Sequence, residues 1–231
     1  MKWRSLEESS PASERRTLHE IYADRKQLIA KYVPPEITAV HDRVIAELES
    51  SGVSSRVLKI GSKAPDFELP DQNRNLVHSS ELLKDRRHVI CFFRGRWCPF
   101  CVGQLEAMNA IYPDLQKADA ALVAISPQTV HQSFLMADQH HLRFPLLSDT
   151  GNQVARQFGV VYRVPEYQQE IYERAFVNLA FINGDTSWEL PIPATYVVDR
   201  DSTVLYAYAN PDYTERPEPG AILQLFPQLS C

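Results

Sequence analysis

The two cysteines of Trp97-Cys98-Pro99-Phe100-Cys101 constrain the fold and chemistry of this chain more than any other feature. They follow residues 88–93, an apolar run rich in β-branched and aromatic side chains that is typical of a buried central strand. Between residues 102 and 117, apolar side chains recur at roughly helical spacing. The pair is therefore expected where a strand leads into a helix, with Pro99 at the first helical position.

This position predicts redox chemistry. A helix N-terminus favours negative charge and so lowers the pKa of a nearby thiol, and the two-residue spacing allows the sulfurs to close a small disulfide bond. A zinc site would usually need a second pair of ligands, and the sequence has no second C-x-x-C and no H-x-x-x-H pattern. A purely structural disulfide is also disfavoured, because so short a loop constrains few unfolded conformations. We therefore expect no metal and no cofactor.

Composition limits the partners. Of 231 residues, 44% are hydrophobic and 23% charged, as in a soluble globular protein. The formal net charge of −5 argues against a nucleic-acid partner. No run reaches the roughly 20 apolar residues of a membrane helix, and residues 1–16 lack the apolar core of a signal peptide. Together with four cysteines that suit a reducing compartment, this predicts a cytoplasmic protein with no membrane association.

The chain divides into an N-terminal helical extension, residues 1–56, and a main α/β domain, residues 57–231. The extension carries two amphipathic stretches, at 18–32 and 37–48, interrupted by Pro34-Pro35. It could be a packed appendage that caps the main domain, or a dimer interface. The region 160–190 is irregular and rich in aromatic residues, which could cover the active site, contact a partner subunit or pack in the core.

In the main domain, strands and helices alternate along much of the sequence, which predicts a largely parallel sheet with helices on both faces. The expected strands are 66–69, 76–78, 88–93, 120–126, 144–147, 195–198 and 204–208, and the expected helices are 81–83, 102–117, 129–141, 149–158, 166–176 and 219–229.

Several motifs resemble a known family. The C-x-x-C pair at a strand-to-helix junction resembles a thioredoxin-fold redox site. Three further segments, 60–67 (Ile-Gly-x-x-Ala-Pro-Asp-Phe), 144–149 and 196–199, occur in the order found in peroxiredoxins, of the alkyl hydroperoxide reductase and thiol-specific antioxidant family. The resemblance covers about residues 58–229. It implies a thioredoxin-like fold, a central mixed sheet flanked by helices.

The resemblance also assigns positions. When Phe92-Phe93-Arg94 is laid on the family's aromatic-aromatic-proline segment, Cys101 takes the position of the peroxidatic cysteine and Cys98 that of a conserved threonine. The family's arginine falls on Pro193, and a proline there resembles the cis-proline that faces the dithiol in thioredoxins. The resemblance thus implies a cis bond between Ile192 and Pro193.

The catalytic candidates are Cys98 and Cys101. We expect Cys98, at the exposed start of the helix, to be the attacking thiolate and Cys101, one turn deeper, to resolve the mixed disulfide. The family register instead places the first attack on Cys101, and the residues leave both assignments open. Arg94 and Arg96 could add positive charge or be solvated surface groups, and Trp97 could form a wall of the site or simply pack.

The remaining cysteines are secondary candidates. Cys91, in the predicted central strand, is expected to be buried and inert. Cys231, the last residue, resembles the C-terminal resolving cysteine of some peroxiredoxins.

Three functions are consistent with these residues. The first is an antioxidant, thiol-dependent peroxidase that reduces hydroperoxides through a Cys98–Cys101 disulfide and is recycled by thioredoxin or another thiol. The second is a thioredoxin-like protein disulfide oxidoreductase, which the match at Pro193 favours. The third is a non-enzymatic redox-sensing interaction module with residues 1–56 as its partner surface. The resemblance favours the first and is compatible with a homodimer.

Overall fold

The computed structural model describes residues 16–226 and is built on a five-stranded mixed sheet of order β5-β4-β3-β8-β9. Three of these strands run parallel to one another: β3 (Arg87–Phe92), β4 (Ala120–Ser126) and β5 (Leu146–Ser148). The other two, β8 (Ala194–Val198) and β9 (Val204–Ala209), run antiparallel to their neighbours. The predicted central mixed sheet is thus confirmed.

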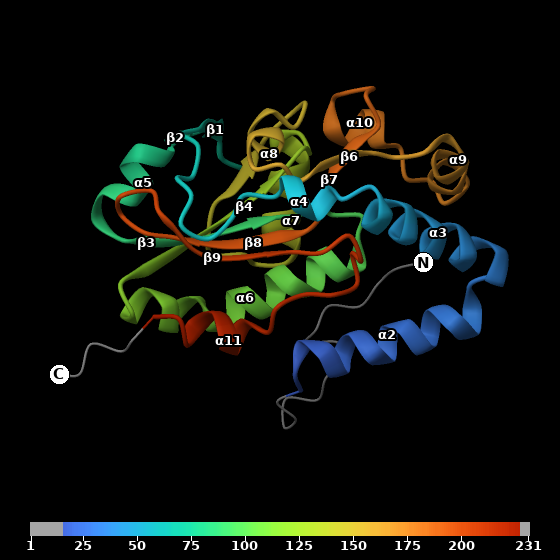
Figure 1. Cartoon of the computed structure of the whole chain (residues 1–231), viewed down its shortest axis with the longest axis horizontal. Coiled ribbons are helices and arrows are strands. Elements are labelled where there is room, and N and C mark those ends of the chain that lie inside the picture. The colour runs from blue at the N-terminus through green and yellow to red at the C-terminus, as the bar shows by residue number, and fades with distance from the viewer. Residues whose placement is uncertain (1–15, 227–231) are drawn as a thin grey trace.

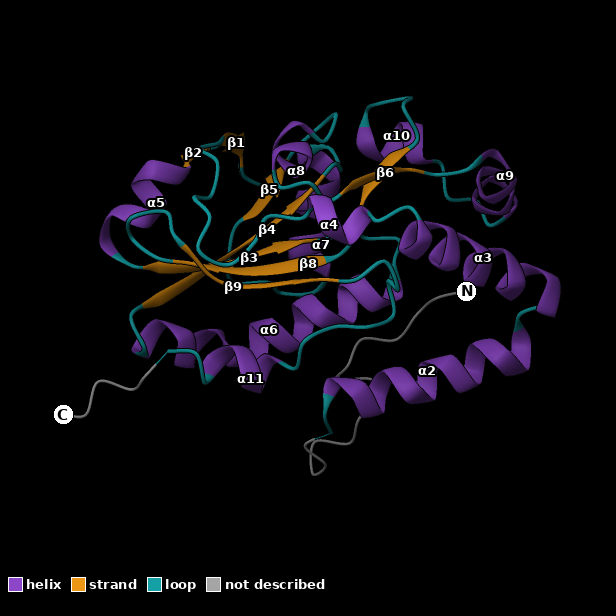
Figure 2. Ribbon diagram, in the orientation of Figure 1, coloured by secondary structure: helices purple, strands orange, loops and turns teal. Residues whose placement is uncertain are grey.

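Helices cover both faces of the sheet, as Figure 2 shows. One face carries α6 (Pro99–Lys117), α7 (Val130–Gln139) and α11 (Pro219–Leu223), and the opposite face carries α5 (Ser79–Asp85) and α8 (Gln153–Gln157). Because successive strand residues point to opposite faces, β3 contributes to two cores. Val89 and Cys91 pack with the face of α6, whereas Ile90 and Phe92 pack with that of α8. Burial on both faces explains why β3 and β4 are almost continuously apolar.

Two small antiparallel pairs lie outside the central sheet. The first joins β1 (Glu68–Pro70) to β2 (Leu76–His78). The second joins β6 (Val161–Arg163) to β7 (Glu189–Pro191) and closes the base of the aromatic-rich segment, which contains α9 (Glu166–Arg174) and α10 (Leu179–Asn183). The β6–β7 pair was not predicted from the sequence.

The described part of the N-terminal extension, residues 16–56, contains three helices, α2 (Leu18–Tyr32), α3 (Pro35–Ser50) and α4 (Val53–Arg56). A capping box between Thr17 and Glu20 starts α2, and the prolines at 34 and 35 separate α2 from α3. Figure 1 shows α2 and α3 (blue) at the end of the molecule where α6 begins, with α9 beside α3. The extension therefore lies directly against the first turn of the helix that carries the two cysteines.

Two predicted boundaries are wrong for identifiable reasons. The helix α9 ends at Arg174 rather than Phe176, because Phe176 adopts a left-handed backbone conformation with φ of 59° that stops a helix. The strand β5 begins at Leu146 rather than Phe144, because Pro145 has no N–H to donate to a ladder.

The last helix, α11, ends at Leu223, earlier than the expected residue 229. None of the helices within residues 16–226 is long and apolar enough to cross a lipid bilayer.

Candidate active site

Both cysteines of the pair are buried thiols at the start of α6. Cys98 is the N-cap residue, Pro99 occupies the first helical position as predicted, and Cys101 lies in the first turn. Only 1% of Cys98 and none of Cys101 is exposed, so the expectation of an exposed Cys98 is wrong. The reason is the packing of α2 over this turn. Tyr22 Oη donates a hydrogen bond to the Phe100 carbonyl, and Arg25 Nη1 donates one to the Pro99 carbonyl over 2.6 Å.

The surroundings of the two sulfurs shift their pKa values in opposite directions. Burial opposes a charge on Cys101, but the hydrogen bond from Cys98 and the positive charges of Arg216 and Arg94 hold the pKa of Cys101 well below its ordinary value. Burial and the hydrogen bond to Cys101 raise the pKa of Cys98. The surroundings of the pair therefore favour the negative charge on Cys101 and the proton on Cys98.

Arg216 is a positively charged residue of the site that was not predicted from the sequence. It comes from the loop before α11, is 2% exposed, and places Nη2 3.6 Å from Cys101 Sγ. Its Nε donates to Gln104 Oε1 over 2.7 Å, and Gln104 Nε2 in turn donates to Thr195 Oγ1 over 3.1 Å. A buried polar chain running from β8 through α6 thus fixes the guanidinium against the sulfur.

The available signal for Arg216 was indirect. Gln104 follows Cys101 by three residues on the same face of a predicted helix, which marks a polar group where apolar ones are expected. Arg216 itself lies in an irregular loop, rich in prolines and acidic residues, that carries no periodicity.

Arg94 is a second buried cation, 2% exposed, and the alternative that it is a solvated surface group is wrong. Its guanidinium carbon lies 4.7 Å from the ring centre of Trp97 and 4.2 Å from that of Tyr213, and its Nη2 donates to Tyr172 Oη. Its Nε has no hydrogen-bond partner, and no ion pair joins it to a carboxylate in the described part of the chain. A guanidinium held in an aromatic cage without an acid acts on the nearby thiolate.

The other predicted site residues are placed differently. Arg96 is directed to α7, where Nη1 donates to Gln132 over 3.1 Å and Nη2 to Gln139 over 3.3 Å. Trp97 stands against the Tyr172 ring at 5.1 Å between centroids and so does flank the site. Cys91 is fully buried, and burial raises its pKa to about 12, in keeping with an inert thiol. Cys231 lies outside the described residues.

The expectation of a cis bond before Pro193 is wrong, because no peptide bond within residues 16–226 is cis. The trans form is the ordinary state of such a bond. Backbone hydrogen bonds fix the chain on either side of it, from Ile192 N to the Val160 carbonyl (2.7 Å) and from Asn210 N to the Pro193 carbonyl (3.3 Å).

A cavity of about 820 Å³ opens beside Cys98. It is bounded by α2, α3, α9 and the loop 212–214, so the N-terminal extension and the aromatic-rich segment both border the cysteine pair. His41, in its wall, is neutral at physiological pH because burial and the charge of Arg94 lower its pKa to about 4. No cluster of three side chains suited to hold a metal occurs within residues 16–226.

The chain is similar to several known proteins. Residues 60–207 match the model of the AhpC/TSA family. Peroxiredoxin Q of Sedum lineare is 30% identical over 71% of this chain and 76% of its own length, and that of Triticum aestivum is 29% identical over 70% of this chain. The chain covers 64% of the wheat protein, less than two thirds of its length.

Among solved structures, peroxidoxin BcpB from Mycobacterium tuberculosis superimposes with a TM-score of 0.59 at 24% identity, over 75% of this chain and 99% of that one. This likeness shows the thioredoxin-like fold. The family model covers well over half of the chain, and the cysteine pair lies within it. The chain belongs to the AhpC/TSA family.

Proposed function

We propose that the protein is a thiol-dependent peroxidase in which Cys101 attacks the hydroperoxide and Cys98 resolves it. The observation that carries this is the position of the buried Arg216, whose Nη2 lies 3.6 Å from Cys101 Sγ. Its charge, with the hydrogen bond from Cys98, holds the pKa of Cys101 below its ordinary value. The family membership and the relatives named peroxiredoxin Q support the same reaction class.

In the first step the Cys101 thiolate attacks the terminal oxygen of R–O–O–H. The O–O bond breaks, Cys101 becomes a sulfenic acid, and the leaving alkoxide takes the proton of the neighbouring Cys98 thiol to become an alcohol. The charges of Arg216 and Arg94 fit this step, because negative charge passes from sulfur to oxygen beside them.

In the second step the Cys98 thiolate, now deprotonated, attacks the sulfur of the Cys101 sulfenic acid. The S–S bond forms as hydroxide leaves and is protonated to water. The dithiol has then lost two electrons and the peroxide has gained them. Two equivalents of an external thiol, or one dithiol such as thioredoxin, return the pair to the reduced state.

The alternative of a protein disulfide oxidoreductase is favoured by the match at Pro193 alone, whereas the family membership supports a peroxidase. The non-enzymatic sensor has no observation in its favour beyond the presence of residues 18–56 as helices.

Two further properties belong to the same proposal. A cytoplasmic location is supported by Cys91, Cys98 and Cys101, which are free thiols as expected in a reducing compartment.

A homodimer is supported by two large apolar side chains of the aromatic-rich segment, Phe176 and Phe181, which are 97% and 70% exposed. Sedimentation velocity at several protein concentrations tests the homodimer, and Phe176→Ser should weaken it.

The peroxidase is tested by turnover. The full-length protein, supplied with dithiothreitol or with thioredoxin, its reductase and NADPH, should consume hydroperoxide in many-fold excess over enzyme. Replacing Cys101 by serine should abolish this. Turnover no faster than that of an equal concentration of free thiol would refute the proposal.

A further inference from the structure

The cavity beside Cys98 is built largely by parts of the chain that lie outside the region matched to the family. Its walls include side chains of α2, the turn at 33–34, α3 and the loop 212–214, whereas the family match runs from residue 60 to 207. Only the end of the cavity near Cys98 and the wall provided by α9 come from the matched region. The cavity is therefore a property of this chain's own additions to the fold.

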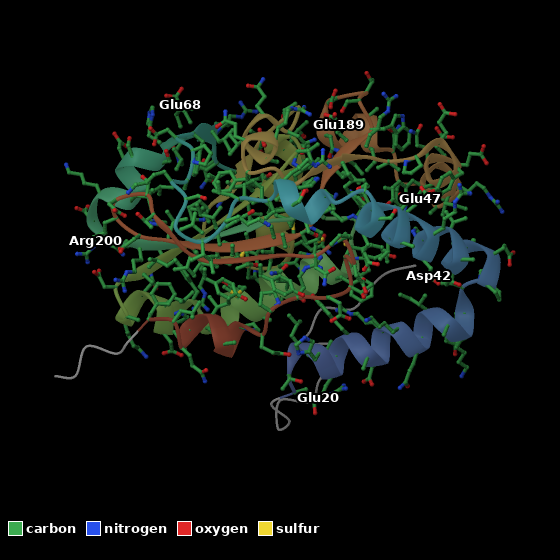
Figure 3. All side chains as sticks on the ribbon, viewed as in Figure 1. Glu20, Asp42, Glu47, Glu68, Glu189 and Arg200 are labelled. Carbon is green, nitrogen blue, oxygen red and sulfur yellow. The ribbon has the colours of Figure 1, made fainter. Side chains whose placement is uncertain are left out.

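The walls are apolar. They carry aliphatic side chains from three helices, Ile29 of α2, Ile37 and Ile45 of α3, and Ile171 of α9, together with Val177. Of the charged residues that line the cavity, Lys26, Asp42 and Arg174 are exposed, Asp212 is partly buried and Arg94 is buried. Figure 3 shows Asp42 on the side of α3 that faces α2. A ligand would thus meet charge at the mouth, and within it largely apolar surface together with the buried guanidinium of Arg94.

The reacting end lies deeper. Cys98 and Arg94 line the cavity where it meets the start of α6. Cys101 does not line it but is hydrogen-bonded to Cys98, which does. Beside them, the rings of Trp97 and Tyr213 complete an apolar surround.

The size of the cavity exceeds what hydrogen peroxide needs. Its volume of about 820 Å³ falls within the range of roughly 300–1,000 Å³ typical of pockets that hold small organic molecules. Hydrogen peroxide has no apolar group that such walls could bind, whereas the carbon skeleton of an organic hydroperoxide would displace water from them.

We propose that this cavity binds the carbon skeleton of a bulky apolar organic hydroperoxide, so that α2, α3 and α9 set the substrate specificity of the enzyme. The proposal rests on the peroxidase function. The hydroperoxy group, two oxygen atoms long, extends past Cys98 so that its terminal oxygen meets Cys101, and the alcohol formed on O–O cleavage remains in the cavity.

A matched pair of variants isolates the cavity. Ala30 of α2 and Ala39 of α3 are both exposed alanines in neighbouring helices, but only Ala30 lines the cavity. Ala30→Phe should fill part of it, and Ala39→Phe should add the same side chain outside it. Neither residue touches the cysteine pair or the arginines in any interaction of the described residues.

The experiment measures second-order rate constants for oxidation of the reduced full-length protein by cumene hydroperoxide, tert-butyl hydroperoxide and hydrogen peroxide. We expect cumene hydroperoxide to react at least about tenfold faster than hydrogen peroxide, since even one added methylene in an apolar pocket is worth about tenfold or more. Ala30→Phe should lower the rate with cumene hydroperoxide several-fold while leaving that with hydrogen peroxide within about twofold. Ala39→Phe should change neither.

The outcomes separate this proposal from the function it rests on. If hydrogen peroxide reacts rapidly and as fast as cumene hydroperoxide, or if Ala30→Phe slows both peroxides equally, the peroxidase stands and the cavity is not its substrate site. If Ala30→Phe instead slows only the reduction of a peptide disulfide, the occupant is a polypeptide and the proposal is wrong. If no hydroperoxide oxidises the protein faster than it oxidises a free thiol, both proposals fail.

Discussion

Arg216 Nη2 lies 3.6 Å from Cys101 Sγ, and the two residues are 115 positions apart in the sequence. By the family register, the position of the catalytic arginine is occupied here by Pro193. Arg216 supplies a guanidinium to the thiolate from a different part of the chain. The anionic state of Cys101 thus depends on how the loop before α11 packs against α6.

Replacing Arg216 by methionine should raise the pKa of Cys101, because a positive charge close to the thiolate is lost. Because the pKa of Cys101 is about 5, the loss is largest in acid: at pH 5 the rate of oxidation by hydroperoxide should fall by about fivefold or more for a rise of one pKa unit or more. The rate should recover as the pH is raised, since the thiolate then forms without assistance. Stopped-flow oxidation from pH 5 to pH 10 measures both effects.

The control for this variant is Arg163→Met, which removes an exposed arginine of β6. It should leave the pH profile unchanged. A profile for Arg216→Met that is merely lowered, with no displacement along the pH axis, would mean that Arg216 acts on folding rather than on Cys101.

Gln104→Leu should reduce activity through Arg216, because Gln104 Oε1 accepts the hydrogen bond from Arg216 Nε over 2.7 Å. A buried donor left without a partner costs about 1–3 kcal/mol, so the free energy of unfolding should fall by that amount. The pH profile of oxidation should shift in the same direction as in Arg216→Met. An unshifted profile in a destabilised protein would show that Gln104 does not position the arginine.

Two tyrosines of α9 offer a matched comparison. Tyr172 Oη accepts a hydrogen bond from the buried Arg94, whereas Tyr167 Oη donates to the exposed Glu47 over 2.6 Å. Tyr172→Phe should lower the free energy of unfolding by about 1–3 kcal/mol, because a buried charged donor loses its partner. Tyr167→Phe should cost less than about 1 kcal/mol. Urea denaturation distinguishes them, and equal losses would contradict the cage assigned to Arg94.

Acid should destabilise the fold through His88. It is 3% exposed, and burial lowers its pKa to about 4. The unfolded chain, in which histidine titrates near pH 6.5, therefore binds the proton first as the pH falls. The contribution is complete above about pH 6.5 and is lost toward pH 4, by about 3 kcal/mol in total. His88→Gln should show a shallower fall over this range in urea denaturation, and an identical slope would contradict the assignment.

Much of the fold could be predicted because its signals are local. The apolar runs of β3 and β4 predict buried strands, Pro99 marks the start of α6, and the prolines at 34 and 35 separate α2 from α3. The position of the cysteine pair between β3 and α6 followed directly from these elements.

The site could be predicted less completely, because its decisive contacts join distant segments. Arg216 reaches Cys101 across 115 residues, and Tyr172 reaches Arg94 across 78, so neither contact leaves a periodic pattern. The burial of Cys98 was missed for the same reason, since it depends on Tyr22 and Arg25 packing over α6. Amphipathic spacing in residues 18–32 indicated a helix but not what that helix covers.

The central claim is that Cys101 holds the thiolate and reacts first. It is tested most directly by single-turnover oxidation of Cys98→Ser and Cys101→Ser with hydroperoxide, followed by trapping of sulfenic acid with dimedone and mass spectrometry. The account predicts that Cys98→Ser is still oxidised rapidly and carries the adduct on Cys101 without forming the disulfide, whereas Cys101→Ser reacts no faster than a free thiol. Rapid oxidation of Cys101→Ser with the adduct on Cys98 would contradict it.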